Sequence, residues 1–181
     1  MKASREGRRA SRGFTLLEVL IALVVLAFGM LALARTIGRS SQEEMEAYQR
    51  TQAMTVASEF VDRIRNNPKQ AALYVGDYVP AGPIEDCTAL DPNDIVVRDQ
   101  CEFRNRLRGA DILDAAKAIG APIAARACVV TAAPNIYVIA VAWQGVLATA
   151  PADSPCGIGA FDREENRRVY STVIQVATLG A

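Results

Sequence analysis

The sequence predicts an α+β protein in which a long amino-terminal helix packs on a carboxy-terminal antiparallel β-sheet. An apolar run at residues 14–34 predicts the first part of the helix. Apolar residues at spacings of three or four then continue the helical pattern to residue 66. Three later segments, 127–131, 136–143 and 168–177, have the composition and alternation of β-strands.

A short basic leader, residues 1–13, precedes the apolar run. Its charged residues are Lys2, Arg5, Arg8, Arg9 and Arg12 against Glu6 alone. Basic residues beside a membrane helix stay in the cytoplasm, so we expect the amino terminus inside and the chain after Arg35 outside. The whole chain has 181 residues and zero net charge, and the part after the leader is mildly acidic. We therefore expect no nucleic-acid partner.

The apolar run is compatible with three kinds of segment. A secretory signal is one, since Ala32-Leu33-Ala34 resembles its small-residue cleavage site, although its apolar region is typically about 7–15 residues. A plain signal anchor is the second, because about 20 apolar residues span the hydrocarbon core. Neither explains the acid at Glu18. An acid or base at the centre of a membrane helix costs about 2.5–3.5 kcal/mol, so such a residue indicates a function.

The third kind of segment accounts for Glu18. A glycine before the run, a phenylalanine that opens it and an acid five residues in resemble the class III signal of type IV pilins and pseudopilins. The resemblance implies a type IV pilin-like fold and cleavage between Gly13 and Phe14 by a prepilin peptidase, which then methylates the amine of Phe14. Glu18 would pair with the cationic amine of a neighbouring Phe14 in the membrane. A Glu18 side chain that reaches the membrane interface is the alternative.

The helix is expected to run from Phe14 to Asn66, with 14–34 as its transmembrane part and 35–67 as its amphipathic part. Pro68 cannot continue it. Arg35 stands where many pilins have a helix-bending proline, so the sequence departs from the family there. The apolar positions beyond the membrane part are Ile37, Met45, Tyr48, Val56, Ala57, Phe60, Val61 and Ile64.

Residues 68–181 are expected to form one extracytoplasmic globular domain. Its first part, 69–109, is rich in turn formers. We expect a short strand or extended segment at 95–97 and a short helix at 111–119. The alternating Arg104, Arg106 and Arg108 would share one face of an extended segment, which favours a solvent-facing strand or loop over a grip on an anionic partner.

All four cysteines lie in the predicted extracytoplasmic part, where an even number favours disulfides. They are Cys87, Cys101, Cys128 and Cys156. Three connectivities are open, and proximity in the sequence favours Cys87–Cys101 and Cys128–Cys156. A zinc site is disfavoured because the chain has no histidine and no Cys-x-x-Cys pair.

Three carboxy-terminal motifs narrow the resemblance to the PilV-type minor pilins. They are a V-x-W-x-G strand at 141–145, Cys156-Gly157-Ile158-Gly159, and Arg167-Arg168-Val169. The apolar run also ends, at 29–34, in a sequence similar to that group. The resemblance implies a low-abundance subunit of a tip or initiation complex that supports pilus assembly, adhesion and twitching motility.

The sequence predicts no catalytic site, no metal site and no cofactor, because it lacks a histidine base and any activated nucleophile. The partners implied by the resemblance are a prepilin peptidase, other minor pilins and the major pilin, the pilus assembly platform, a tip adhesin and the membrane. The implied location is the bacterial inner membrane, with the carboxy-terminal domain in the periplasm, and later the pilus on the cell surface. A minor pseudopilin of a type II secretion system and a membrane-anchored periplasmic binding domain remain as alternatives.

Overall fold

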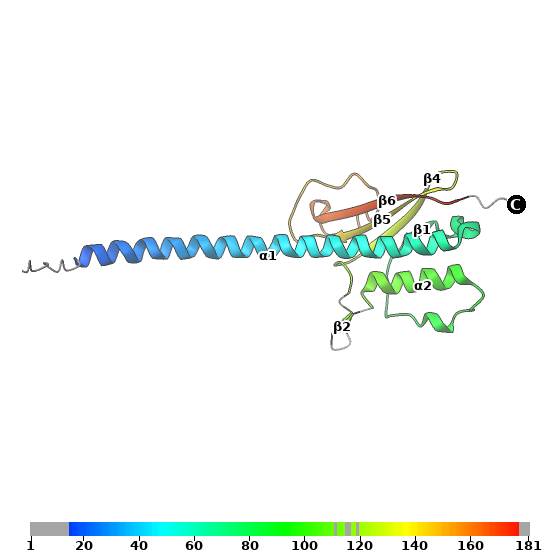
Figure 1. The fold of residues 1–181 in the computed structure, drawn as a ribbon, viewed down its shortest axis with the longest axis horizontal. Coiled ribbons are helices and arrows are strands. Elements are labelled where there is room, and N and C mark those ends of the chain that lie inside the picture. The colour runs from blue at the N-terminus through cyan, green and yellow to red at the C-terminus, as the bar shows by residue number, and fades with distance from the viewer. Residues whose placement is uncertain (1–14, 111, 115–116, 119, 178–181) are drawn as a thin grey trace, which may run out of the picture. The chain divides into compact units, whose positions relative to one another are not determined.

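A computed structural model of the chain describes residues 15–110, 112–114, 117–118 and 120–177 (Figure 1). Helix α1 runs from Leu16 to Asn66 and ends where Pro68 was expected to stop it. An antiparallel four-stranded sheet follows later in the chain. The α+β, pilin-like fold class is therefore confirmed. The chain divides into two units, Met1–Ser41 and Gln42–Ala181.

In the first unit, the described part of α1 exposes its side chains on every face, although most of them are apolar. An 18-residue window of the helix has a mean hydropathy of 2.8 and none of it is buried. By length and composition, this is the one described helix able to cross a membrane. A helix that is apolar all round needs lipid or other helices around it. This part of α1 therefore fits an inner-membrane anchor.

In the second unit, α1 buries one face against the rest of the domain. The buried residues are Gln49, Ala53, Val56, Ala57, Phe60, Val61 and Ile64. Met45 and Tyr48, expected on this face, are 48% and 50% exposed, and Ile37 in the first unit is 68% exposed. The buried face of α1 begins only at Gln49, so the apolar residues before it do not pack against the core of the domain.

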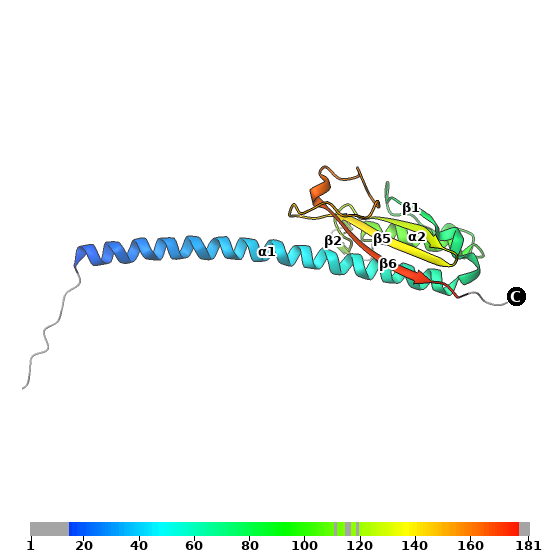
Figure 2. The ribbon, with the colours of Figure 1, turned by 90° about the horizontal axis from the view of Figure 1, so that it is seen from above.

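The sheet has the strand order β1-β4-β5-β6, and all of its pairs are antiparallel (Figure 2). The strands are β1, Gly76–Tyr78; β4, Arg126–Ala133; β5, Ile136–Gln144; and β6, Arg167–Gln175. The three predicted strands are confirmed as β4, β5 and β6. The inner face carries side chains such as Val129, Ile139, Val141 and Ile174, which form one core with α1.

The segment expected to be extended at 95–97 is instead the start of helix α2, Ile95–Arg108, so that prediction is wrong. Its amino terminus is capped by Asp94, whose carboxylate accepts a hydrogen bond from the Val97 N–H at 3.2 Å. Its carboxy terminus ends at Gly109, which adopts φ 82° in the left-handed region. These two caps outweigh the strand preference of the β-branched residues between them.

The helix predicted at 111–119 is also wrong. The described residues there form two short paired strands, β2 at Leu113–Asp114 and β3 at Lys117–Ala118, while 111, 115–116 and 119 lie outside the described residues. The chain returns on itself, because the N–H of Gly120 donates to the carbonyl of Gly109 at 3.1 Å. A Cβ on Gly109 would lie 2.5 Å from the Gly120 nitrogen. This close return is incompatible with a continuous helix.

The described residues also form three short 3₁₀ helices: η1, Pro68–Tyr74; η2, Cys87–Ala89; and η3, Glu164–Asn166. The long connection before η3 is held by Arg167, which is only 3% exposed. Its guanidinium donates to the carbonyls of Ala152 at 2.8 Å, Ser154 at 2.6 Å and Cys156 at 3.0 Å. It also pairs with Glu164 at 2.6 Å. A buried cation is tolerated here because four oxygen atoms accept its hydrogen bonds.

A buried carboxylate joins α1, η1 and α2. Asp99 accepts hydrogen bonds from the Arg63 guanidinium at 2.7 Å and the Tyr74 hydroxyl at 2.6 Å. Burial, and then the bond to Asp99, raises the pKa of Tyr74, so its hydroxyl remains a donor. Tyr78 closes the group by donating to the Tyr74 carbonyl at 2.7 Å, and burial raises its pKa to about 12.

Two disulfides tie the peripheral segments to this core. Cys87 on η2 is bonded to Cys101 on α2, and Cys128 on β4 is bonded to Cys156 in the connection before η3. These are the two pairings that proximity in the sequence favours. The first fixes the loop before α2, and the second holds the long connection on the outer face of the sheet.

Asp99→Asn should lower the free energy of unfolding by about 1.5–3 kcal/mol, the value of a hydrogen bond to a charged group, since the buried Tyr74 hydroxyl and the partly buried Arg63 guanidinium lose their anionic acceptor. Glu102→Gln is the matched control. Glu102 also lies 2.7 Å from Arg63, but its side chain is 41% exposed, so its loss should cost less than about 1 kcal/mol. Urea unfolding of the detergent-solubilised chain, followed by circular dichroism, measures both. Equal effects of the two substitutions would contradict the assignment.

Replacing both cysteines of one pair by serine should also destabilise the domain. The bond between Cys128 and Cys156 closes 28 residues and that between Cys87 and Cys101 closes 14. The chain-entropy model predicts losses of about 3.6 and about 3 kcal/mol, the larger for the longer loop. Urea midpoints of the two double variants test this order. Peptide mapping without reduction checks the pairs, and free thiols or crossed pairs would contradict them.

Candidate functional site

The amino-terminal segment holds the residues predicted to act in assembly. Gly13 and Phe14 lie outside the described residues, so the cleavage and methylation sites stay predictions. Thr15 precedes α1, and Glu18 is in the first turn of the helix. The Glu18 N–H donates to the Thr15 carbonyl at 3.1 Å and to its hydroxyl at 3.3 Å. Thr15 therefore caps the amino terminus of the apolar helix.

The Glu18 carboxylate is exposed and has no hydrogen-bond or ion-pair partner among the residues from Thr15 onward that the structure describes. Around it lie exposed apolar side chains, including Leu17, Val19 and Ile21. A carboxylate in such surroundings is costly in lipid unless a cation approaches it. Pairing of Glu18 with a positive group from a neighbouring subunit therefore stays a prediction.

The carboxy-terminal motifs meet at one end of the sheet. In the β5–β6 register, Trp143 lies opposite Arg168 and Gln144 lies opposite Arg167. A Cβ on Gly145 would lie 2.8 Å from the Glu46 carboxylate and 3.0 Å from the Arg168 guanidinium, so a larger residue there would displace the ends of these two side chains. Gly157 adopts φ 73°, and a Cβ there would approach Ala142 to 3.0 Å. These motifs therefore fix a local structure, with one residue of α1 included.

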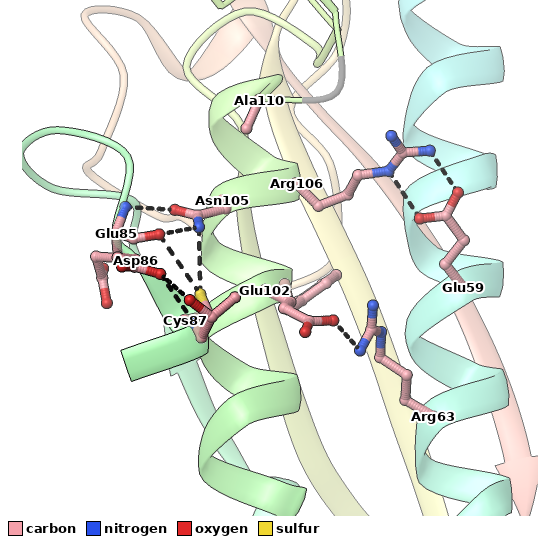
Figure 3. Close-up of a pocket in the computed structure, with 11 residues that line it drawn as sticks. Glu59, Arg63, Glu85, Asp86, Cys87, Glu102, Asn105, Arg106 and Ala110 are labelled. Atoms are coloured by element: carbon pink, nitrogen blue, oxygen red, sulfur yellow. Dashed lines mark hydrogen bonds and ion pairs between the residues drawn. The ribbon is translucent and has the colours of Figure 1, made fainter. Parts of the chain in front are cut away.

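A cavity of about 540 Å³ lies between α1, α2 and the loop around η2 (Figure 3). Most of its charged side chains are already paired with each other, and Asp86 accepts two hydrogen bonds from Thr88. Glu59 receives two hydrogen bonds from Arg106, at 2.7 and 2.5 Å, and Arg63 bonds Glu102 at 2.7 Å. Ligand sites combine apolar walls with a few free polar groups. In this cavity the ion pairs between Glu59 and Arg106 and between Arg63 and Glu102 instead hold α2 to α1.

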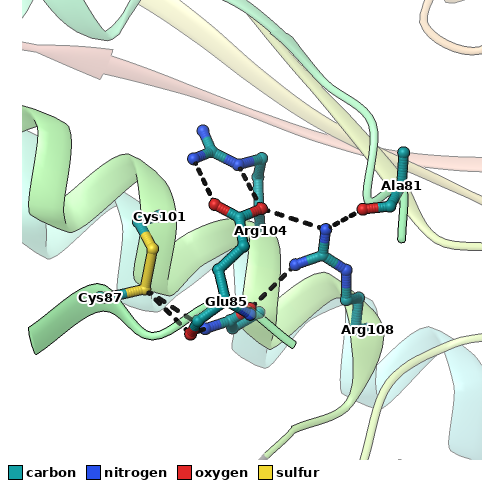
Figure 4. Close-up of polar contacts among 7 residues, drawn as sticks. Ala81, Glu85, Cys87, Cys101, Arg104 and Arg108 are labelled. Carbon is teal, nitrogen blue, oxygen red and sulfur yellow. Dashed lines mark hydrogen bonds and ion pairs between the residues drawn. A yellow bond between two sulfur atoms is a disulfide. The ribbon is translucent and has the colours of Figure 1, made fainter. Parts of the chain in front are cut away.

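Glu85 shows the same use of charge in the loop before α2 (Figure 4). Its carboxylate accepts from Arg104 at 3.2 and 3.0 Å and from Arg108 at 3.1 Å. These hydrogen bonds lower the pKa of Glu85 to about 2. The prediction that Arg104, Arg106 and Arg108 lie on a solvent-facing strand or loop is wrong, because all three are on α2 and bind acids of other segments.

The sequence reading missed the polar residues that hold the domain together, above all Asp99 and Glu85. One signal was present: Asp94 and Gly109 bracket a helix-length segment in which Val96, Phe103 and Leu107 recur on one face. Among the described residues, no group of three or more His, Cys, Asp or Glu could hold a metal ion. The expectation that the protein is not an enzyme stays a prediction.

Comparison with known proteins finds a family match for one part of the chain. Residues 8–34 match the family described as prokaryotic N-terminal methylation motif. No curated protein and no solved structure matches the chain. The matched motif is the class III signal, which implies processing by a prepilin peptidase and association with the membrane. It supports a type IV pilin or pseudopilin as the family of this chain.

Proposed function

We propose that this protein is a minor pilin of a type IV pilus. The leader stays in the cytoplasm, the prepilin peptidase cuts between Gly13 and Phe14, and α1 holds the mature chain in the bacterial inner membrane with its globular domain in the periplasm. The subunit then enters the pilus by packing α1 among the helices of other pilins. The observation that carries this proposal is Glu18, the single acid of the exposed apolar part of α1, which lies within the methylation motif matched at residues 8–34.

The assembly step follows from the charge of Glu18. Cleavage creates a cationic amine on Phe14, and a neighbouring subunit can bring that amine to the unpartnered carboxylate. The pair removes most of the cost of an isolated charge in lipid, which is about 2.5–3.5 kcal/mol at the helix centre. In lipid the apolar faces gain nothing from water exclusion, so packing and such polar contacts drive association. The ion pair would therefore set the register between neighbouring helices.

The minor-pilin assignment rests on the carboxy-terminal half. Its motifs resemble those of PilV-type minor pilins, and in the structure they share one end of the sheet around Trp143, Gly145 and Arg168. The role we infer is in a tip or initiation complex with other minor pilins, the major pilin, the assembly platform and a tip adhesin. Such a complex would support pilus assembly, adhesion and twitching motility.

A minor pseudopilin of a type II secretion system is the second candidate, because the matched motif serves both systems. Deletion of the gene separates the two candidates: loss of twitching with normal exoprotein release supports the pilus, and the reverse supports secretion. A membrane-anchored binding domain with no filament is disfavoured, since most charged side chains of the 540 Å³ cavity are paired with each other.

Mass spectrometry of the mature protein should find Phe14 as the amino-terminal residue with one methyl group on its amine. Gly13→Ala should leave the precursor uncut if the peptidase reads the glycine, with the leader still attached. A mature chain that begins at Arg35 would instead establish conventional signal cleavage after Ala34 and would contradict the proposal.

Glu18→Ala should abolish or strongly reduce incorporation into pili while leaving the amount of membrane protein unchanged. Glu18→Gln is the decisive control. The Thr15 hydroxyl caps the helix by accepting from the backbone N–H of residue 18, so this variant keeps the cap and loses only the charge. Pilus number and immunodetection in sheared pili measure the effect. Normal assembly of Glu18→Gln would show that the negative charge at residue 18 is not needed and would contradict the ion pair.

A further inference from the structure

Strand β6 forms an open edge of the sheet (Figure 2). The Val176 N–H donates to the Asn135 carbonyl at 2.8 Å, and the Gly145 N–H donates to the Asn166 carbonyl at 2.7 Å. The register between these points is regular, so the even-numbered residues of β6 bond to β5. The backbone groups of Val169, Ser171, Val173 and Gln175 therefore point away from the sheet. No hydrogen bond within the described chain reaches them.

This edge lacks the features that usually protect an edge strand. The segment Val169–Gln175 contains no charged residue, no proline and no glycine, and its ladder with β5 has no bulge. Its composition of valine, tyrosine, threonine and isoleucine favours β structure. Natural proteins normally interrupt such an edge or cover it, because it is a template for another strand.

A groove of about 400 Å³ lies at the start of the same edge, between α1 and β6. Two of its lining side chains have unused donors. Trp143 is 3% exposed, and its indole N–H has no hydrogen-bond partner among the described residues. Arg50 is exposed and makes no ion pair within the described chain.

The one acid of the groove is already engaged. The Glu46 carboxylate accepts from the Leu147 N–H at 2.9 Å and lies 3.5 Å from the Arg168 guanidinium. Glu46 and Arg168 thus neutralise each other, and Arg50 leaves the groove with one excess positive charge. A buried N–H without an acceptor costs about 1–3 kcal/mol. Both donors therefore favour an occupant that brings an anionic oxygen.

We propose that β6 and this groove bind an extended segment of another polypeptide that carries a carboxylate side chain. The segment adds a strand to the β6 edge through Val169, Ser171 and Val173, and its carboxylate accepts from Arg50 and from the Trp143 indole. Backbone pairing gives the affinity, and the groove selects the acid. This surface is separate from the amino-terminal motif, so the proposal does not rest on the pilin assignment.

Trp143 is the single tryptophan of the chain, so its fluorescence reports on the groove directly. The probe is a blocked six-residue peptide of sequence Thr-Val-Glu-Val-Thr-Val, titrated into the full chain in detergent. We expect a shift of the Trp143 emission and a Kd about tenfold lower than for the peptide with glutamine in place of glutamate, the effect of one charge-assisted hydrogen bond. In Arg50→Gln the two peptides should bind equally.

Changes that remove backbone N–H groups test whether the peptide adds a strand to β6. Ser171→Pro removes an outward N–H and none that bonds β5, so it should abolish binding while the thermal unfolding midpoint stays close to that of the parent. Two peptides N-methylated at alternate, complementary positions test the same point without changing the protein, since only one of them can pair with the edge. Equal binding of both N-methylated peptides would overturn strand addition.

Two further outcomes would overturn the proposal. Free acetate that shifts the Trp143 emission as strongly as the peptide, at the same concentration, would show a small carboxylate site with no strand partner. Dimers in sedimentation velocity that disappear in Ser171→Pro would identify a second copy of this chain as the occupant.

Discussion

The globular domain depends on the packing around Phe60. This fully buried ring of α1 stacks on Phe103 of α2, with centroids 3.6 Å apart and planes within 4°. The edges of Tyr74 and Tyr78 close the cluster at centroid distances of 5.7 and 5.1 Å. Each such aromatic pair contributes about 0.5–1.5 kcal/mol beyond the apolar area it buries. One side chain thereby joins α1, η1, β1 and α2.

This cluster also explains where the polar contacts of the domain lie. With α2 held against α1 at Phe103, residues one turn to either side face the α1 surface. Asp99 meets Arg63 and Tyr74, and Arg106 meets Glu59. Ion pairs of this kind add little free energy when exposed, but they disfavour other registers of the two helices. The charges around the 540 Å³ cavity are thus a consequence of helix docking.

The sequence predicted the elements whose pattern is long and local. The end of α1 at Asn66 follows from Pro68, and β5 follows from the alternation of Tyr137, Ile139 and Val141 with smaller residues. It failed where short segments gave conflicting signals. Ile95-Val96-Val97 has strand propensity, yet Asp94, Gly109 and the burial of Phe103 against Phe60 make it helical. The sequence of a short segment alone does not predict tertiary contacts of this kind.

The same distinction separates the two surfaces on which the protein is inferred to act. Gly13, Phe14 and Glu18 are neighbours in the chain, so their order alone identifies the amino-terminal motif without any fold. The groove beside β6 combines Arg50, Trp143 and Val169 from three distant segments; the last two belong to motifs seen in the sequence, but nothing in the sequence links them to Arg50. Its donors become visible only when burial shows that the Trp143 indole has no acceptor. A short motif can therefore direct this chain to the membrane and to the assembly machinery. The choice of a partner polypeptide would instead depend on the folded domain.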